Sequence, residues 1–250
     1  MPEIPCDKRH AALNIFQIGQ KERMPKLYHF TLDPYSRRVR LSLAEYGDIC
    51  PLVDERPWTP SQTLSDLNPS GLLPVMVEDS GLAICGIEAL SEYLEETRMM
   101  KMRLLPGNAF ARAEIRRLVA WFDVKFYTDV TEPLLTEKVI KRFLDYNAGG
   151  GAPDMARVRQ AKSRLKPHLD YVAYLAEQRS WLAGEELSLA DLAAAAHISA
   201  IDYLGDIDWA DYPVAKSWYQ RIKSRPSFRT LLGDNMPAMP PSATYADLDF

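Results

Sequence analysis

The sequence has no long hydrophobic run, few cysteines and no large excess of charge. None of its apolar stretches approaches the ~18 residues of a membrane-spanning helix, and residues 1–23 lack the continuous apolar segment of a secretory signal. Cys6, Cys50 and Cys85 are odd in number and lack metal-ligand spacing, so we interpret them as reduced thiols and expect no metal site. A net charge of -4 gives no reason to expect nucleic acid or a membrane surface as a partner. Together these absences predict a cytoplasmic protein.

Residues 24–100 alternate between strand and helix patterns. The sequence KLYHF indicates a strand, RRVRLSLAEYG a helix that ends at Gly47, and ICPLVDE a second strand. After a turn at NPSG, the sequence LLPVMVEDSGLAICG predicts a hairpin and IEALSEYLEET a helix. The order β-α-β-(α)-β-β-α predicts a mixed α/β domain. Residues 1–23 show no such pattern and are expected to form a flexible extension.

The rest of the chain has helical periodicity. We predict helices near residues 109–130, 132–147, 154–178, 188–203 and 213–224, with a short one after Pro226. Ser188 is expected to cap one of them, because the carboxylate of Asp191 can reach back to the Ser188 amide. These helices predict an all-α domain over residues 106–233, followed by a proline-rich C-terminal tail over residues 234–250.

Four local sequences in this order resemble those of one family. They are DPYSRRVRLSLAEYG, NPSGLLPVM, ICGIEALSEYL and WLAGEELSLADL. Together they resemble the cytosolic glutathione transferase superfamily over about residues 26–233. The resemblance implies a thioredoxin-like α/β N-terminal domain, an all-α C-terminal domain and a cis-proline at Pro74. It also implies that what remains of a glutathione subsite lies at Leu73, Pro74, Glu88 and Ala89.

The residue that would activate glutathione departs from the family pattern. Members of the superfamily donate a hydrogen bond to the glutathione thiolate or use a cysteine, and in families with this kind of turn that residue precedes the proline. Here it is Asp33, and an ionised carboxylate ~4 Å from a thiolate repels it by about 4 kcal/mol at an effective dielectric constant of ~20. We therefore expect Asp33 to cap the following helix. If the chain is an enzyme, the predicted donors are Tyr28 and Ser36.

The glutathione subsite departs from the pattern in a second place. The resemblance implies a Glu-Ser pair whose hydroxyl holds a carboxylate of glutathione, and this sequence has Glu88-Ala89. The lost hydrogen bond to a charged group costs ~1.5–3 kcal/mol, so affinity falls by more than about tenfold. Backbone amides and the helix N-terminus remain, which leaves weak glutathione binding open. Two departures at one site favour a non-catalytic protein, with a glutathione S-transferase that uses an atypical donor as the alternative.

Two clusters outside this site are candidate binding surfaces. Arg37, Arg38 and Arg40 form a basic cluster on the first helix, which we interpret as a solvated face in preference to a site for an acidic partner. Trp58 lies in an irregular stretch between two prolines. An exposed aromatic side chain there would anchor a partner chain, and burial within the fold is the equal alternative.

The C-terminal sequence YADLDF alternates large apolar groups with acids. Tyr245, Leu248 and Phe250 are separated by Asp247 and Asp249. A segment of this kind docks on its own domain, is recognised by another protein or stays disordered. We predict that its five large or acidic residues, with Trp58, bind a partner.

The beginning and end of the chain sharpen the resemblance. MPKLYHFTLDPYSRRVRLSLAEYG and YADLDF are similar to an alphaproteobacterial branch of the superfamily that binds the bacterial tubulin FtsZ. This resemblance spans residues 24–250. It implies a homodimer that binds FtsZ filaments, is recruited to the division site and supports constriction.

Overall fold

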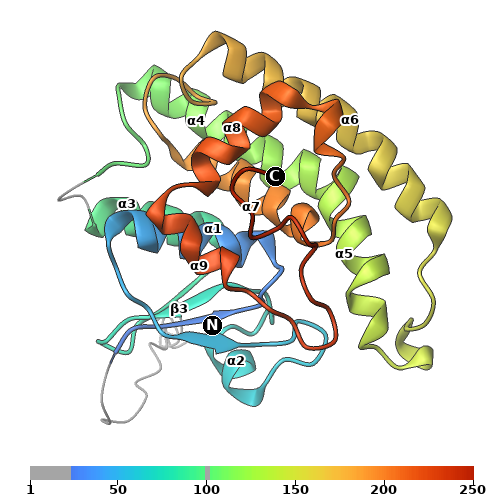
Figure 1. Ribbon diagram of the computed structural model, residues 1–250. Coiled ribbons are helices and arrows are strands. Elements are labelled where there is room, and N and C mark those ends of the chain that lie inside the picture. The colour runs from blue at the N-terminus through green and yellow to red at the C-terminus, as the bar shows by residue number, and fades with distance from the viewer. Residues whose placement is uncertain (1–23, 99–101) are drawn as a thin grey trace, which may run out of the picture.

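The computed structural model describes residues 24–98 and 102–250 as an α/β part followed by a helical part (Figure 1). The predicted extension, residues 1–23, lies outside the described residues. The observed order β-α-β-α-β-β-α, followed by helices alone, confirms the predicted fold class. None of the helices in the described part of the chain combines the length and apolarity needed to cross a membrane.

The N-terminal part is a four-stranded sheet with helices on both faces. Its strands are β1 (Lys26–His29), β2 (Leu52–Asp54), β3 (Val75–Val77) and β4 (Ala83–Cys85), in the order β2-β1-β3-β4. Only the β1–β2 pair is parallel within this sheet. Its helices are α1 (Pro34–Tyr46), α2 (Gln62–Leu67) and α3 (Ile87–Thr97). Because side chains alternate along β1, Leu27 faces α1 and α3 while Tyr28 faces α2.

Two turns at one end of this sheet follow from single residues. Asp33 caps α1 by accepting a hydrogen bond from the Ser36 amide at 2.7 Å, and Pro34 occupies the first turn, where its missing N–H leaves no bond unmade. The Leu73–Pro74 peptide bond is cis, as predicted. Asp33 and Leu73 thereby reach the edge of the sheet where the two parts of the chain meet.

The C-terminal part is arranged around one buried helix. Its elements are α4 (Ala109–Ala120), the π-helix η1 (Trp121–Thr131), α5 (Glu132–Lys138), the 3-10 turns η2 (Ile140–Arg142) and η3 (Tyr146–Ala148), α6 (Met155–Gln178), α7 (Leu189–Tyr203), η4 (Trp209–Asp211), α8 (Pro213–Lys223), η5 (Pro226–Phe228) and α9 (Arg229–Leu232). Every residue of α7 is buried. The predicted capping contact opens α7, because the Asp191 carboxylate accepts from the Ser188 amide at 3.1 Å. α1 packs directly on α7, so the two parts share one hydrophobic core.

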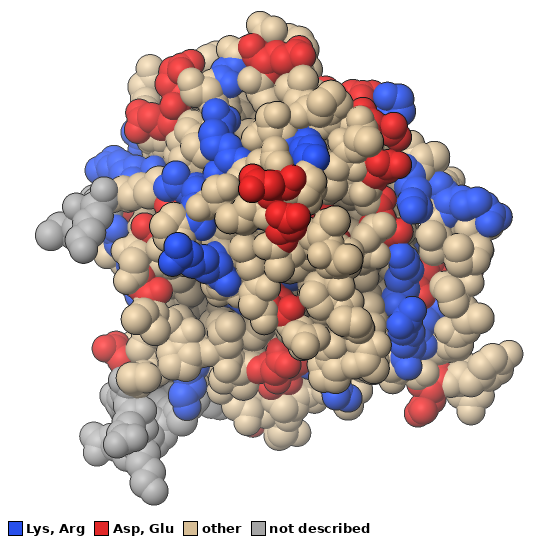
Figure 2. All heavy atoms as spheres, in the orientation of Figure 1, with Lys and Arg blue, Asp and Glu red and all other residues tan. Residues whose placement is uncertain are grey.

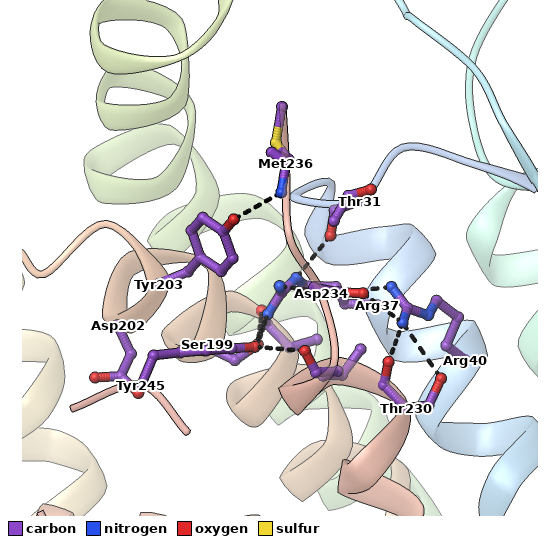
Figure 3. A network of polar contacts seen from close by, with 12 residues as sticks. Thr31, Arg37, Arg40, Ser199, Asp202, Tyr203, Thr230, Asp234, Met236 and Tyr245 are labelled. Atoms are coloured by element: carbon purple, nitrogen blue, oxygen red, sulfur yellow. Dashed lines mark hydrogen bonds and ion pairs between the residues drawn. The ribbon is translucent and has the colours of Figure 1, made fainter. Parts of the chain in front are cut away.

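The basic cluster on α1 lies in this interface. Arg37, Arg38 and Arg40 are 0%, 1% and 4% exposed, so the predicted solvated face is wrong. Arg38 pairs with Asp123 of η1, while Arg37 and Arg40 share the carboxylate of Asp234, which follows α9 (Figure 3). The three guanidinium groups are buried because carboxylates from the C-terminal part of the chain meet them there.

Candidate functional site

A cavity of about 770 Å³ opens between the two parts of the chain. The loops that follow β1 and precede β3, with the start of α3, form one wall, and η1, α5 and η2 form the other. Its charged lining residues are Asp33, Glu88 and Glu132, and no lysine, arginine or histidine lines it among the described residues. The cavity has the size of a small-molecule site, and the charges on its walls are negative.

Asp33 lines the cavity and caps α1 with the same carboxylate. Its Oδ2 accepts from the Ser36 amide at 2.7 Å and from the Ser36 hydroxyl at 2.6 Å. Burial raises the pKa of Asp33 to about 6, against the lowering effect of these hydrogen bonds. The carboxyl group is therefore mostly ionised at pH 7. It puts a negative charge at the position that the family resemblance assigns to the thiol-activating residue.

Neither predicted donor reaches the cavity. The Ser36 side chain is fully buried, and its hydroxyl donates to Asp33. The Tyr28 side chain lies on the other face of the sheet, where it packs with Leu64 and Val75 and does not line the cavity. Both assignments are therefore corrected, because neither hydroxyl is placed to donate to a sulfur atom in the cavity.

Two tyrosines outside the predicted donor pair do line the cavity. The Tyr35 hydroxyl donates to the backbone carbonyl of Asp123 at 2.7 Å, which commits its proton. The Tyr127 ring lies 5.2 Å from that of Tyr35. Burial and the charges of Asp33 and Glu132 raise the pKa of Tyr127 to about 12. Surroundings that oppose a phenolate also oppose a thiolate, so the cavity does not favour an activated thiol.

Three of the four residues predicted for a glutathione subsite line the cavity. Leu73, Glu88 and Ala89 line the cavity, and Pro74 is buried. The N-cap residue of α3 is Gly86, which offers no side-chain hydrogen bond, and Glu88 in the first turn already supplies the negative charge that a helix N-terminus favours. Glutathione carries one amino group, with which Glu88 could pair, and two carboxylates, for which the described lining residues offer no basic side chain. These residues fit weak glutathione binding at most, and they do not fit thiolate activation.

Trp58 is half-buried against the helical part of the chain. Its ring lies edge-on to Phe30 at 5.3 Å and stacks on Phe143 at 5.5 Å. Phe30 also lines the cavity. Trp58 is therefore a partly exposed aromatic residue beside the cavity. It is neither the fully exposed anchor nor the fully buried core residue that its sequence context allowed.

The C-terminal segment docks on its own protein. The Tyr245 side chain is fully buried, and its hydroxyl accepts from Arg37 at 2.9 Å and donates to the Leu231 carbonyl at 3.1 Å (Figure 3). A buried side chain cannot contact a partner, so the role predicted for Tyr245 is corrected. Phe250 is half-buried. The predicted contact residues of this segment that remain exposed are Asp247, Leu248 and Asp249.

One hydrophobic cluster connects Trp58, the cavity and the C-terminal segment. This interdomain cluster consists of Phe30, Leu32, Leu135, Val139, Tyr203, Met236, Met239 and Tyr245, with Trp58, Leu73 and Phe143 packed at its edge. Phe30 and Leu135 belong both to the cluster and to the cavity lining. Trp58 and Tyr245 lie far apart in the sequence, and yet both pack in this cluster. No local sequence pattern indicates this arrangement.

Comparison with known proteins identifies the family. Residues 34–97 match the glutathione S-transferase N-terminal domain, and residues 142–232 match the glutathione S-transferase C-terminal domain. The chain is 47% identical to FtsZ-localized protein A of Caulobacter vibrioides, over 90% of this chain and 97% of that relative. Among solved structures, a glutathione S-transferase from Sinorhizobium meliloti is 51% identical with a TM-score of 0.87, and FzlA from C. crescentus is 46% identical with a TM-score of 0.86. Each match covers 91% of this chain and 100% of the other. The chain therefore belongs to the glutathione S-transferase family.

Proposed function

We propose that this protein binds FtsZ filaments, is recruited to the division site in the cytoplasm and supports constriction during bacterial cell division. The similarity to FtsZ-localized protein A, 47% over 90% of this chain and 97% of the relative, carries the proposal. Fold alone does not decide function, since one fold hosts many sites. The residues that line the cavity therefore have to be compatible with a filament-binding role.

The cavity supports binding without catalysis. Asp33 is ionised where a thiol would need a donor, and both hydroxyls expected to replace it are buried elsewhere. A filament-binding protein has no need to activate a thiol. If this chain conjugated glutathione, it would have to do so in a cavity whose charged side chains, among the described residues, are all acidic.

The proposed filament-binding surface consists of Trp58, the mouth of the cavity and the exposed residues Asp247, Leu248 and Asp249. In a homodimer, two copies of this surface would be related by a two-fold axis. Two sites on one rigid body can bridge neighbouring protofilaments through effective concentration, even where each single contact is weak. We therefore expect the dimer to bundle filaments. A monomeric variant should bind along filaments without bundling them.

The direct test is co-sedimentation of the full chain with polymerised FtsZ. Asp247→Lys should lower the pelleted fraction strongly, because it reverses one charge of the exposed segment. Asp247→Asn keeps an acceptor for the Asp249 amide and so separates the loss of charge from the loss of that hydrogen bond. Asp170→Lys on α6 is a matched control, since that side chain is also exposed, at 53%. If Asp247→Lys pellets like the unmodified protein, the C-terminal segment is not part of the surface. If the unmodified protein stays in the supernatant, the function itself is wrong.

Glutathione separates this proposal from the enzymatic alternative. We expect no retention on immobilised glutathione at physiological salt and no conjugation of a standard electrophile. Tyr127 is the phenol to change if conjugation is seen, because it lines the cavity while Tyr28 does not. Conjugation that is lost in Tyr127→Phe would identify an active transferase and overturn the non-catalytic reading.

A further inference from the structure

The exposed residues near the C-terminus form a short bridge between two anchored aromatic side chains. Tyr245 precedes the bridge and Phe250 follows it, with residues 246–249 between them. Local hydrogen bonds also fold the bridge: the Asp247 amide donates to the Thr244 carbonyl at 3.1 Å, and the Asp249 amide donates to Asp247 Oδ1 at 2.9 Å. A free tail has none of these constraints.

The first anchor holds the bridge to α1. Arg37 donates to the Tyr245 hydroxyl at 2.9 Å and to Ser199 Oγ at 2.7 Å, and its guanidinium lies 5.7 Å from the centre of the Tyr245 ring (Figure 3). The ring also meets Tyr203 edge-on at 5.1 Å. Tyr245 is therefore fixed at both its hydroxyl and its ring, by residues from α1 and α7.

The second anchor holds the end of the chain to α8. The Phe250 ring centre lies 3.9 Å from Lys223 Nζ, 5.1 Å from Lys216 Nζ and 5.3 Å from the Trp209 ring. Lys223 is 1% exposed and lies 3.4 Å from Asp202, so the Phe250 ring covers a buried ion pair. A cation over an aromatic face attracts it more strongly when water is excluded.

Between these anchors the bridge presents two carboxylates around one apolar side chain. Asp247 and Asp249 are exposed, and Leu248 is 39% exposed. Figure 2 shows acidic side chains gathered where Figure 1 places the C-terminus, with basic side chains nearby on the same face. A surface that complements this bridge is basic and has a small apolar depression.

We infer that residues 246–249 form an epitope that is already ordered before binding and that recognises a basic partner surface with an apolar depression for Leu248. The inference rests on the proposed function, in which that surface belongs to the FtsZ filament. An epitope fixed at both ends loses little conformational entropy on binding, whereas a flexible tail has to be ordered by its partner. Phe250 is thus a positioning residue, which contributes to binding without touching the partner.

The test uses Phe250→Ala in the full chain, with Tyr174→Ala as a control that removes an exposed aromatic ring from α6. Hydrogen exchange of the Asp247 and Asp249 amides, which donate the hydrogen bonds within this segment, should be slow in the unmodified protein, faster in Phe250→Ala and unchanged in Tyr174→Ala. Affinity for FtsZ filaments should fall about tenfold in Phe250→Ala only. In the unmodified protein it should also fall with added salt, and this salt dependence should flatten in Asp247→Asn/Asp249→Asn.

Two results would overturn the inference. The first is fast exchange of the Asp247 and Asp249 amides in the unmodified protein, which would mean that the bridge is not ordered. The second is faster exchange in Phe250→Ala with unchanged filament affinity, which would mean that order at this site does not matter for binding. If the unmodified protein fails to bind filaments at all, the proposed function fails. The inferred partner fails with it, while the exchange data still decide whether the bridge is fixed.

Discussion

Helices α1 and α6 carry similar basic sequences and lie in opposite environments. The three arginines of α1 are at most 4% exposed. The lysine and arginine side chains of α6 that form ion pairs with neighbouring elements are Arg157, Lys162 and Arg164, and they are 39%, 47% and 48% exposed. Both sets form ion pairs, so pairing does not distinguish them. The difference is that α1 faces the other half of the chain, whereas α6 faces solvent along its charged side.

This comparison shows how little a run of basic residues says about its role. Burying a guanidinium group is costly unless acceptors meet its donors. Arg37 finds acceptors in Thr31, Ser199, Asp234 and Tyr245, and the last three are far from it in the sequence. The sequence of α1 alone does not indicate these distant partners. It therefore favours a solvated face, which the structure excludes.

The largest expected effect is the loss of Arg37. Arg37→Ala leaves the Asp234 carboxylate with Arg40 alone and removes a donor from Tyr245, so we expect a cost of about 3–5 kcal/mol in the free energy of unfolding. Arg164→Ala removes a surface ion pair and should cost less than about 1 kcal/mol. Urea unfolding followed by circular dichroism measures both. Equal costs for the two variants would mean that burial is not what separates the helices.

Glu137 pairs with Arg157 of α6 but, unlike the lysine and arginine side chains of that helix, is buried. Its carboxylate is 1% exposed, accepts from the Asp154 amide at 2.8 Å and pairs with Arg157 at 3.1 Å. Glu137→Ala should therefore cost about 2–3 kcal/mol even though its partners are partly exposed, and Glu137→Gln should recover part of that loss. Unfolding midpoints in urea give the answer. A loss below that of Arg164→Ala would contradict the weight we give to burial.

The smallest expected change in the free energy of unfolding concerns Asp33 and Asp154, which cap α1 and α6. The effect of replacing the carboxylate at neutral pH has opposite signs at the two positions. Burial raises the folded pKa of Asp33 to about 6 from 3.8, so the native state binds more protons and loses stability as pH rises from about 4 to 6. Asp33→Asn keeps an acceptor for the cap. It should be more stable than the unmodified protein at pH 7.5, by about 1 kcal/mol once the partial exposure of Asp33 is taken into account, and equal to it near pH 4.

Asp154 caps α6 at the surface, and hydrogen bonds from the Ala156 and Arg157 amides lower its pKa. Its contribution is present above the unfolded pKa and is lost as pH falls through the folded value. Asp154→Asn should therefore be less stable than the unmodified protein at pH 7.5 and equal to it in acid. Unfolding in urea at both pH values compares the two caps. The same sign for both variants would refute the assignment of burial as the cause at Asp33.

What the sequence predicted correctly is local. The element order, the Asp33 cap, the cis peptide bond before Pro74 and the Ser188–Asp191 contact each depend on residues a few positions apart. Glu88 and Ala89, which were predicted from a local motif, also line the cavity, while their role toward glutathione stays a prediction.

What the sequence could not predict depends on contacts across the chain. Whether Tyr28 faces the cavity is decided by its place in the sheet relative to α2, and the motif around it does not specify that face. The docking of Tyr245 depends on Arg37, which is buried only because the end of the chain returns to it. Residues of the right type were found near the site, but the assignment of roles required the tertiary structure.

The return of Tyr245 to α1 also has a consequence for the order of folding. The N-terminal part is synthesised first, and the guanidinium group of Arg37 then still lacks the acceptors supplied by Ser199, Asp234 and Tyr245. Burying that group without its acceptors is costly, so α1 can complete its packing only after these residues have joined it. The two parts of the chain are therefore expected to complete their folding together.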